Sequence, residues 1–312
     1  MKPRIYLLSI GLLVIIGLGT LLGFGADYAY LFDIVSHFRL QYALGAILTG
    51  FVFALFRKWF AVLAAVVVLV VNLSLIVPLY FFPDSLSISN PPVRVLLMNV
   101  LSSNQNTDAV IDQINRYQPN ILALEEITPR WFAALSDQLR RDYPYQLHAV
   151  RDDNFGIWLL SRLPISSEEI IPWGNRQLPS ATFRVRVGER WVRVVAMHPM
   201  SPGDPQGVRW RNAQLRQIAE RFEASDEPLL VVGDLNTTSF APVFQEFAQR
   251  LRLSDSRQGF GLQSSWPAFL LDPFMITLDH CLVSADWKVV HRETGDYTGS
   301  DHLPVYVEVD LR

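Results

Sequence analysis

The chain has 312 residues, 50% of them hydrophobic, and its mean hydropathy of +0.20 is too high for an ordinary soluble protein. Its 27 Lys and Arg and 30 Asp and Glu give a net charge of −3, which argues against a protein that holds long nucleic acid by charge alone. The single cysteine, Cys281, excludes an intrachain disulfide.

The N-terminal part of the chain carries the excess of apolar residues. Three uncharged stretches are each roughly 17 to 24 residues long, enough for a helix that crosses about 30 Å of hydrocarbon. They are residues 5–25, 40–56 and 59–82. The first is longer than the apolar core of a signal peptide, so we expect it to be retained as a helix. The sequence therefore predicts a membrane region over residues 1–83 with about three transmembrane helices.

Basic residues predict how these helices are oriented. Lys2 and Arg4 precede the first span, and Arg57 and Lys58 separate the second from the third. Positively charged loops stay in the cytoplasm, so three spans place the remaining chain on the outer face. We therefore expect a multi-pass protein of the cell inner (plasma) membrane with an extracytoplasmic domain. The second span is the weakest because it is short and contains Gln41, and the topology inverts if it does not cross.

A Pro- and Ser-rich tether at 84–91 leads to a single large domain over residues 92–312. Five of the basic and two of the acidic residues precede Asp84, which leaves the tether and domain together, residues 84–312, with 22 basic and 28 acidic residues, a net charge of −6.

In this domain, apolar runs alternate with signals for helix starts and ends. Strands are predicted at 93–100, 120–126, 156–161, 181–187, 191–198, 228–234, 276–284 and 303–311. Helices are predicted at 106–118, 128–141, 207–222 and 241–251. Thr128 followed by Pro129 is a strong start signal for the second of these helices. Some strands alternate polar and apolar residues while others are apolar throughout, so we expect an α/β fold of sheets covered by helices.

Residues that can bind a metal or transfer a proton lie at the ends of six predicted strands. They are Asn99, Glu126, His198, Asp234 with Asn236, Asp279, and Asp301 with His302. If these strands lie side by side, their ends bring an amide, several carboxylates and two imidazoles into one cleft. Clustered carboxylates need a cation or shared protons, and oxygen donors without a thiolate select Mg²⁺ or Mn²⁺. Such a site suits hydrolysis of a phosphate ester.

Seven segments resemble, in order, the motifs of the endonuclease/exonuclease/phosphatase superfamily. They read LLMNV, PNILALEEIT, GIWLLSRLPI, MHPMSP, VVGDLNTT, LDHCLVS and GSDHLPV. That family includes pancreatic deoxyribonuclease, apurinic endonucleases, neutral sphingomyelinases and inositol polyphosphate phosphatases. The resemblance covers about residues 92–312 and implies a four-layer sandwich, two β-sheets flanked by helices, here preceded by the transmembrane helical region.

The resemblance also implies a metal side of the site, which holds Mg²⁺ (or Mn²⁺). Glu126 corresponds to the main metal ligand, supported by Asn99, and Asp301 belongs to the same side. Glu125 departs from the family, which usually has Gln at this position, and the extra carboxylate either tightens metal binding or faces solvent.

On the phosphate side, the resemblance implies that His302 faces the scissile phosphate and that Asp279 orients its ring. Asp234 positions or deprotonates the attacking water, and Asn236 holds a phosphate oxygen. His198 stabilises the charge that grows on the phosphoryl group.

The function expected is that of a membrane-anchored, divalent-metal-dependent phosphoesterase, nuclease-like, that cleaves phosphodiester or phosphomonoester bonds. Its substrate is a nucleic acid, a phospholipid or an inositol phosphate, and no obligate protein partner is evident. One alternative is a lipid phosphodiesterase of the sphingomyelinase type, favoured by the acidic domain and the anchor. A second is a non-catalytic binding module of the same fold. His280 and Thr277 replace the Tyr and Arg that apurinic endonucleases have around Asp279, which argues against abasic-site repair.

Overall fold

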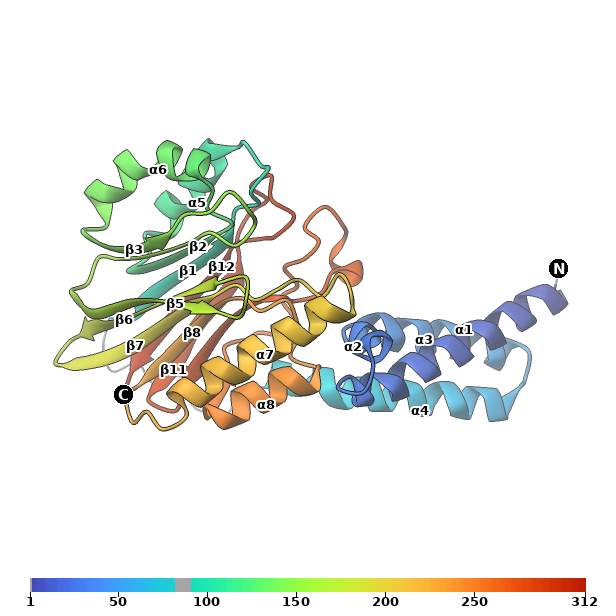
Figure 1. The fold of residues 1–312 in the computed structure, drawn as a ribbon. Coiled ribbons are helices and arrows are strands. Elements are labelled where there is room, and N and C mark those ends of the chain that lie inside the picture. The colour runs from blue at the N-terminus through green and yellow to red at the C-terminus, as the bar shows by residue number, and fades with distance from the viewer. Residues whose placement is uncertain (1, 82–90) are drawn as a thin grey trace.

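The computed structural model describes residues 2–81 and 91–312, and the expected tether at 84–91 lies almost entirely outside them. Figure 1 shows a domain of packed sheets and helices, from one side of which a bundle of apolar helices projects.

The projecting bundle comprises most of the predicted membrane region. Its helices are α1 Lys2–Leu22, η1 Gly23–Gly25, α2 Tyr30–Ser36, α3 Arg39–Leu55, α4 Trp59–Ile76 and η2 Val77–Tyr80. Two segments, Arg4–Gly25 and Trp59–Tyr80, are long and apolar enough to cross a membrane. The pair α2 and α3 gives a third span only if the 72° bend between them is included. The weakest predicted span, residues 40–56, corresponds to α3, which is continuous but only 17 residues long, and the bend lies just before it.

The remaining chain folds into two six-stranded mixed sheets. The first has the order β11-β12-β1-β2-β4-β3, and the second has the order β5-β6-β7-β8-β10-β9. Strands of the first sheet are β1 Val93–Asn99, β2 Ile121–Glu125, β3 Tyr145–Ala149, β4 Ile157–Ser161, β11 Trp287–Thr294 and β12 Val305–Leu311. Strands of the second sheet are β5 Ile165–Trp173, β6 Leu178–Val187, β7 Arg190–Met197, β8 Leu229–Asp234, β9 Leu253–Asp255 and β10 Asp279–Ser284. Apolar runs in the sequence do not predict β3, β5, β9 or β11.

Helices cover the outer face of each sheet. They are α5 Thr107–Tyr117 and α6 Pro129–Asp142 on the first sheet, and α7 Pro205–Phe222 and α8 Pro242–Arg250 on the second. The start signal predicted at Thr128 is used, because Thr128 Oγ1 accepts from Trp131 N at 3.3 Å. Asn106 caps the preceding helix in the same way, its Oδ1 accepting from Ala109 N at 3.2 Å.

Three buried apolar clusters hold the layers together. The central cluster fills the space between the sheets, with Phe183 and Val307 among its members. The other two join a sheet to its helices, around Phe244 on the second sheet and Trp131 on the first. The domain therefore has four layers, helices, sheet, sheet and helices, with an apolar core between each pair of neighbouring layers. The predicted sandwich of two β-sheets flanked by helices is confirmed.

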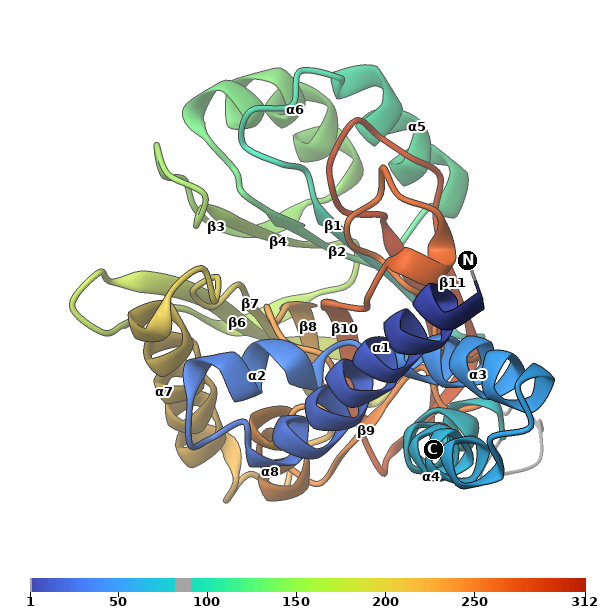
Figure 2. The ribbon, with the colours of Figure 1, turned by 90° about the vertical axis from the view of Figure 1, so that its right-hand side faces the viewer.

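Strand register brings the polar strand ends together. Parallel pairing of β1 with β2 aligns Asn99 with Glu125, and antiparallel pairing of β8 with β10 aligns Asp234 with Asp279. These strand ends lie on the side of the domain that faces the apolar helices (Figure 2). The strand order and register therefore place the polar residues of both sheets at one edge of the sandwich.

A buried ion pair joins the helical bundle to the domain. Both guanidinium ends of Arg211, on α7, donate to the carboxylate of Asp33, on α2, at 3.1 and 2.5 Å. Arg211 is fully buried and also donates to the carbonyl of Asn236 at 3.0 Å. Because an isolated buried charge is strongly unfavourable, each partner depends on the other.

Substituting Arg211 should therefore destabilise the full chain. Arg211→Met leaves Asp33 buried without a cation, and we expect a loss of about 3–5 kcal/mol in the free energy of unfolding. Thermal unfolding of the detergent-solubilised protein measures this loss. Arg216→Met is the control, because Arg216 lies on the same helix and its ion pairs with Asp27 and Glu246 are solvent-exposed. It should cost about 1 kcal/mol or less, and equal losses in the two variants would contradict the role of the buried pair.

Candidate active site

A cleft of about 590 Å³ lies at the gathered strand ends. We call it the strand-end cleft. Six of the predicted site residues line it: Glu126, His198, Asp234, Asn236, Asp301 and His302. The other two, Asn99 and Asp279, contact these residues from the base of the cleft. The structure therefore brings all eight predicted residues together.

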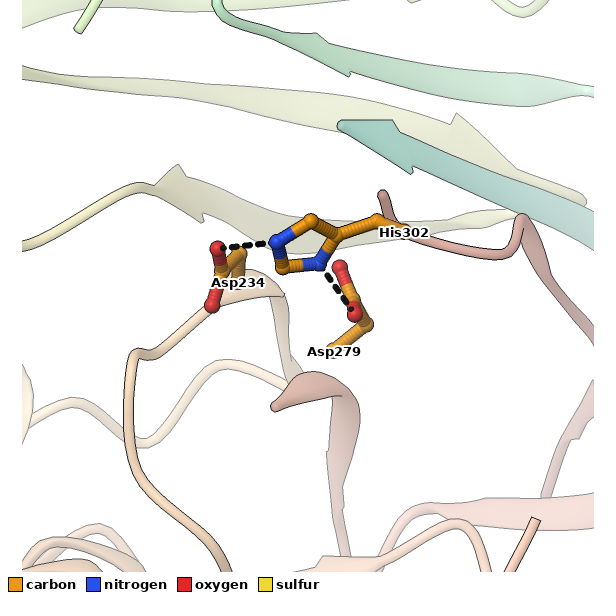
Figure 3. A group of neighbouring side chains, drawn as sticks. All are labelled: Asp234, Asp279 and His302. Carbon is orange, nitrogen blue, oxygen red and sulfur yellow. Dashed lines mark hydrogen bonds and ion pairs between the residues drawn. The ribbon is translucent and has the colours of Figure 1, made fainter. Parts of the chain in front are cut away.

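His302 is held between two carboxylates from the second sheet (Figure 3). Its Nδ1 lies 2.8 Å from Asp279 Oδ2, and its Nε2 lies 3.5 Å from Asp234 Oδ2. Burial by itself lowers the pKa of His302, but the negative charges of Asp279 and Asp234 outweigh it and raise the pKa to about 10. The imidazole is therefore protonated at neutral pH.

Asp234 is the shared partner of several groups. Its Oδ2 lies 3.4 Å from His198 Nε2 and 3.3 Å from Asn99 Nδ2, and its Oδ1 accepts from Asn236 N at 2.9 Å. Burial raises the pKa of Asp234, but the charge of His302 and the hydrogen bond from His198 lower it to about 2. The pKa of His198, which burial alone lowers, rises to about 9 through its hydrogen bond with Asp234. Asp234 is thus ionised and flanked by two protonated rings.

Glu126 lies beside this cluster in a left-handed backbone conformation, with φ 61°. Its Oε1 accepts from Asn99 Nδ2 at 3.2 Å, and its Oε2 accepts from Ser102 N at 2.8 Å. A non-glycine residue pays roughly 1–3 kcal/mol for this conformation, so tertiary contacts hold it there. The bend turns the carboxylate that follows β2 into the cleft.

The donor set fits a hard divalent cation. Glu126, Asp234 and Asp301 bring three carboxylates to the cleft. Asn99 presents its Nδ2 to Glu126 and Asp234, while its Oδ1 accepts from Leu101 N at 3.1 Å, so its amide oxygen would have to exchange that hydrogen bond to bind a cation. Asp301 Oδ1 is buried and has no hydrogen-bond partner, as expected of an atom that awaits a ligand. Asp234, Asp279 and His302 also have ligand atoms within 4.8 Å of one another. Both nitrogens of His302 already face carboxylates there, so a cation between them would compete with those contacts.

Glu125 does not face solvent, contrary to one of the two expectations from the sequence. Its side chain is fully buried, and its Oε2 accepts from the backbone N of Asp234 at 3.0 Å. Burial raises its pKa to about 8, and the charges of Asp234 and Asp279 act in the same direction, whereas His198 opposes them. A protonated Glu125 is neutral at pH 7, as is the Gln that the family usually has at this position. Its hydrogen bond with the backbone of Asp234 holds the end of β8 in place.

Two parts of the cleft were not predicted from the sequence. Ile34, His37 and Phe38, from α2 and the turn after it, line the cleft although they precede the α/β domain by more than fifty residues. Phe155 lines it too, with its ring centred 5.4 Å from that of His198. The α2 segment could have been suspected from Asp33, an acidic residue in an otherwise apolar stretch.

Trp266 lies in the cleft rather than in the core. Its indole Nε1 donates to Asp301 Oδ2 at 3.1 Å, and its ring is centred 6.5 Å from that of His302. The aromatic ring thus orients one carboxylate and forms part of the cleft wall.

Comparison with known proteins gives the same fold. The Endonuclease/Exonuclease/phosphatase family model matches residues 96–302. TDP2 from D. rerio, solved with a single-strand DNA product, aligns with a TM-score of 0.60 at 15% identity over 71% of this chain and 100% of that one. The human Nocturnin catalytic domain, solved with a sulfate anion, aligns with a TM-score of 0.56 at 19% identity over 71% and 94% of the two chains.

An endonuclease/exonuclease/phosphatase from Beutenbergia cavernae aligns with a TM-score of 0.56 at 18% identity, over 71% of this chain and 72% of that one. No curated protein sequence matches the chain. At such identities the structural likeness concerns the fold, while the family match covers the segment that carries all eight site residues.

Proposed function

We propose that this chain, which belongs to the endonuclease/exonuclease/phosphatase family, is a membrane-anchored, divalent-metal-dependent hydrolase of phosphoester bonds. The observation that carries the proposal is the protonated His302 between Asp279 and Asp234, with Glu126 in the same cleft. A cationic donor beside a candidate metal site is what attack on a phosphate ester requires.

His302 is the residue we assign to the scissile phosphate. Its Nδ1 donates to Asp279, which fixes the orientation of the ring and directs Nε2 toward Asp234 and the cleft. A protonated Nε2 can donate to a phosphate oxygen whose negative charge grows in the transition state. Asp279 makes this possible by stabilising the imidazolium, so we assign it an orienting role.

Asp234 and its neighbours complete the site. An acid with a pKa near 2 is a weak base, so Asp234 suits orienting the attacking water better than removing its proton. His198, protonated and in contact with Asp234, would bind a phosphoryl oxygen, and Asn236 would hold another. Glu126, Asn99 and Asp301 would hold Mg²⁺ or Mn²⁺, which would neutralise charge on the reacting phosphate.

The apolar bundle supports membrane attachment. The N-terminus and the turn with Arg57 and Lys58 lie at the end of the bundle away from the α/β domain (Figure 1). If the bent pair of α2 and α3 crosses together with α1 and α4, positive residues stay in the cytoplasm and the domain lies on the outer face of the inner (plasma) membrane. We therefore propose residues 1–83 as the membrane region and 92–312 as the catalytic domain.

Metal dependence has a direct test. Glu126→Gln removes one negative charge from the donor set, so turnover of bis(p-nitrophenyl) phosphate in millimolar Mg²⁺ should fall about 100-fold or more. Glu189→Gln, at an exposed turn, is the matched control and should match the wild type. EDTA should abolish wild-type activity, and equal turnover in EDTA and in Mg²⁺ would refute a metal-dependent reaction.

If His302 and Asp279 act as one unit, their substitutions should not be additive. His302→Ala and Asp279→Asn should each lower kcat/KM by up to about 10⁴-fold, and the double variant should be little worse than the worse single one. His291→Ala is the control, because His291 pairs with Glu293 at the exposed surface. Near-normal turnover in folded His302→Ala protein would end the catalytic assignment.

Topology can be tested with introduced cysteines, because the native Cys281 is buried. In intact cells, a membrane-impermeant maleimide should label Glu189→Cys, in the turn between β6 and β7. Lys58→Cys should react only after permeabilisation. The reverse pattern would invert the proposed orientation.

A further inference from the structure

One loop of the α/β domain presents an unusual apolar surface. The segment 268–275, which we call the apolar loop, includes η3 Asp272–Phe274. Its exposed side chains are Phe269 (71% exposed), Leu270 (43%), Leu271 (74%) and Phe274 (63%). Among the described residues of the domain, the other large apolar side chains exposed to a comparable degree are Trp210 and Tyr297, which are single. A cluster of four is a contact surface rather than a random exposure.

The apolar loop is tied to a membrane helix. Gln41 Nε2, in the first turn of α3, donates to the carbonyls of Pro273 and Met275 at 2.9 and 3.1 Å. Figures 1 and 2 show the short orange helix η3 on the side of the domain that faces the apolar bundle. The exposed side chains therefore lie beside the start of α3, where the proposed bilayer surface meets the domain.

The same loop borders the strand-end cleft. Trp266 and Ile276, which flank it, line the cleft, and Ala268 N donates to the carbonyl of Asp301 at 2.8 Å. Ile34 and Phe38 line the cleft from the membrane region. Because α2 is bent by 72° from α3, it lies close to the plane of the bilayer when α3 crosses it. The cleft is thus bounded by two elements of the proposed membrane surface.

We infer that the substrate is a phosphoester lipid taken from the bilayer itself. Its phosphate headgroup enters the strand-end cleft, while its hydrocarbon chains stay among the lipids beside the apolar loop. A cleft of about 590 Å³ suits a headgroup, and a segment 84–312 with a net charge of −6 is unsuited to long nucleic acid. This inference rests on the proposed phosphoesterase function and specifies its substrate class.

The kinetic test compares two substrates with the same scissile bond. Hexadecyl p-nitrophenyl phosphate carries a hydrocarbon chain, whereas ethyl p-nitrophenyl phosphate is water-soluble. We measure kcat/KM for both with the full chain in dodecyl maltoside micelles with Mg²⁺. The wild type should favour the hexadecyl ester by about tenfold or more, because its chain stays in the apolar phase beside the cleft.

A triple variant tests the apolar loop. Phe269→Ser, Leu271→Ser and Phe274→Ser together should lower kcat/KM for the hexadecyl ester by about tenfold and leave the ethyl ester unchanged. Unchanged ethyl turnover also shows that the variant is folded, since these side chains do not line the cleft. Trp210→Ser, an isolated exposed aromatic residue on α7, is the control and should leave both rates unchanged.

A physical measurement tests the membrane contact without any substrate. Leu271→Cys, labelled with a nitrobenzoxadiazole dye in phosphatidylcholine vesicles, should be quenched by nitroxide-labelled lipids. Glu189→Cys should not be, because its hairpin lies at the end of the domain away from the bundle (Figure 1).

Ethyl ester turnover without a hexadecyl preference, a preference that survives the triple substitution, or an unquenched Leu271→Cys label would each overturn the lipid inference while the phosphoesterase proposal stands. If neither ester is hydrolysed, the phosphoesterase proposal and the lipid inference that rests on it both fail, whatever the label reports of the loop.

Discussion

One buried carboxylate, that of Asp234, sets the constraint on which the rest of the site depends. It ends β8 with only 1% of its surface exposed, where an unpaired charge would be strongly unfavourable. The chain meets this demand with three nitrogens around Oδ2, from Asn99, His198 and His302. Asn99 belongs to the first sheet and Asp234 to the second, so satisfying the charge also joins the two sheets at the edge where the cleft forms.

The same crowding explains the unusual backbone of the site. Gly233 precedes Asp234, and a Cβ added there would lie 1.9 Å from the carbonyl oxygen of Met197, so β7 and β8 approach closely only because this residue is glycine. Asn236 has φ 51°, which asparagine tolerates, and its Nδ2 donates to the carbonyl of Pro199 at 3.0 Å. Glu126, at φ 61°, has no such intrinsic tolerance and is held by its side-chain contacts. Two of the residues that face the cleft, Glu126 and Asn236, therefore adopt a left-handed backbone that their contacts hold in place.

These contacts explain what could be predicted from the sequence and what could not. The polar residues at the strand ends could be predicted, because an apolar run that stops at a carboxylate is a local signal. Their gathering in one cleft could be expected as well, because neighbouring strands align their ends. The helix cap at Thr128 was predictable too, because Thr128 and the Pro129 that follows it are a local sequence signal. By contrast, β5 carries the exposed residues of an edge strand and has no continuous apolar run. The role of Glu125 depends on a hydrogen bond to Asp234, more than a hundred residues away, which no local pattern encodes.

The largest difference between the sequence prediction and the structure concerns α2, which belongs to the helical bundle but contacts the strand-end cleft. A seven-residue segment that contains an acid reads as a loop, yet Asp33 pairs with Arg211, whose Nη1 also donates to the carbonyl of Asn236. Four residues further on, His37 Nδ1 lies 3.1 Å from Thr238 Oγ1. The loop that carries Asn236 is thus braced from the helical bundle.

A division of the chain at the tether, natural from composition alone, separates Arg211 from its buried counter-charge and removes one wall of the cleft. The first removes the charge partner of Arg211, whose Nη1 holds the carbonyl of Asn236, and the second removes the side of the cleft that Ile34 and Phe38 line. The bundle therefore does more than supply apolar helices. It completes the site whose chemistry the strand ends supply, so the physical unit of function runs through both parts of the chain.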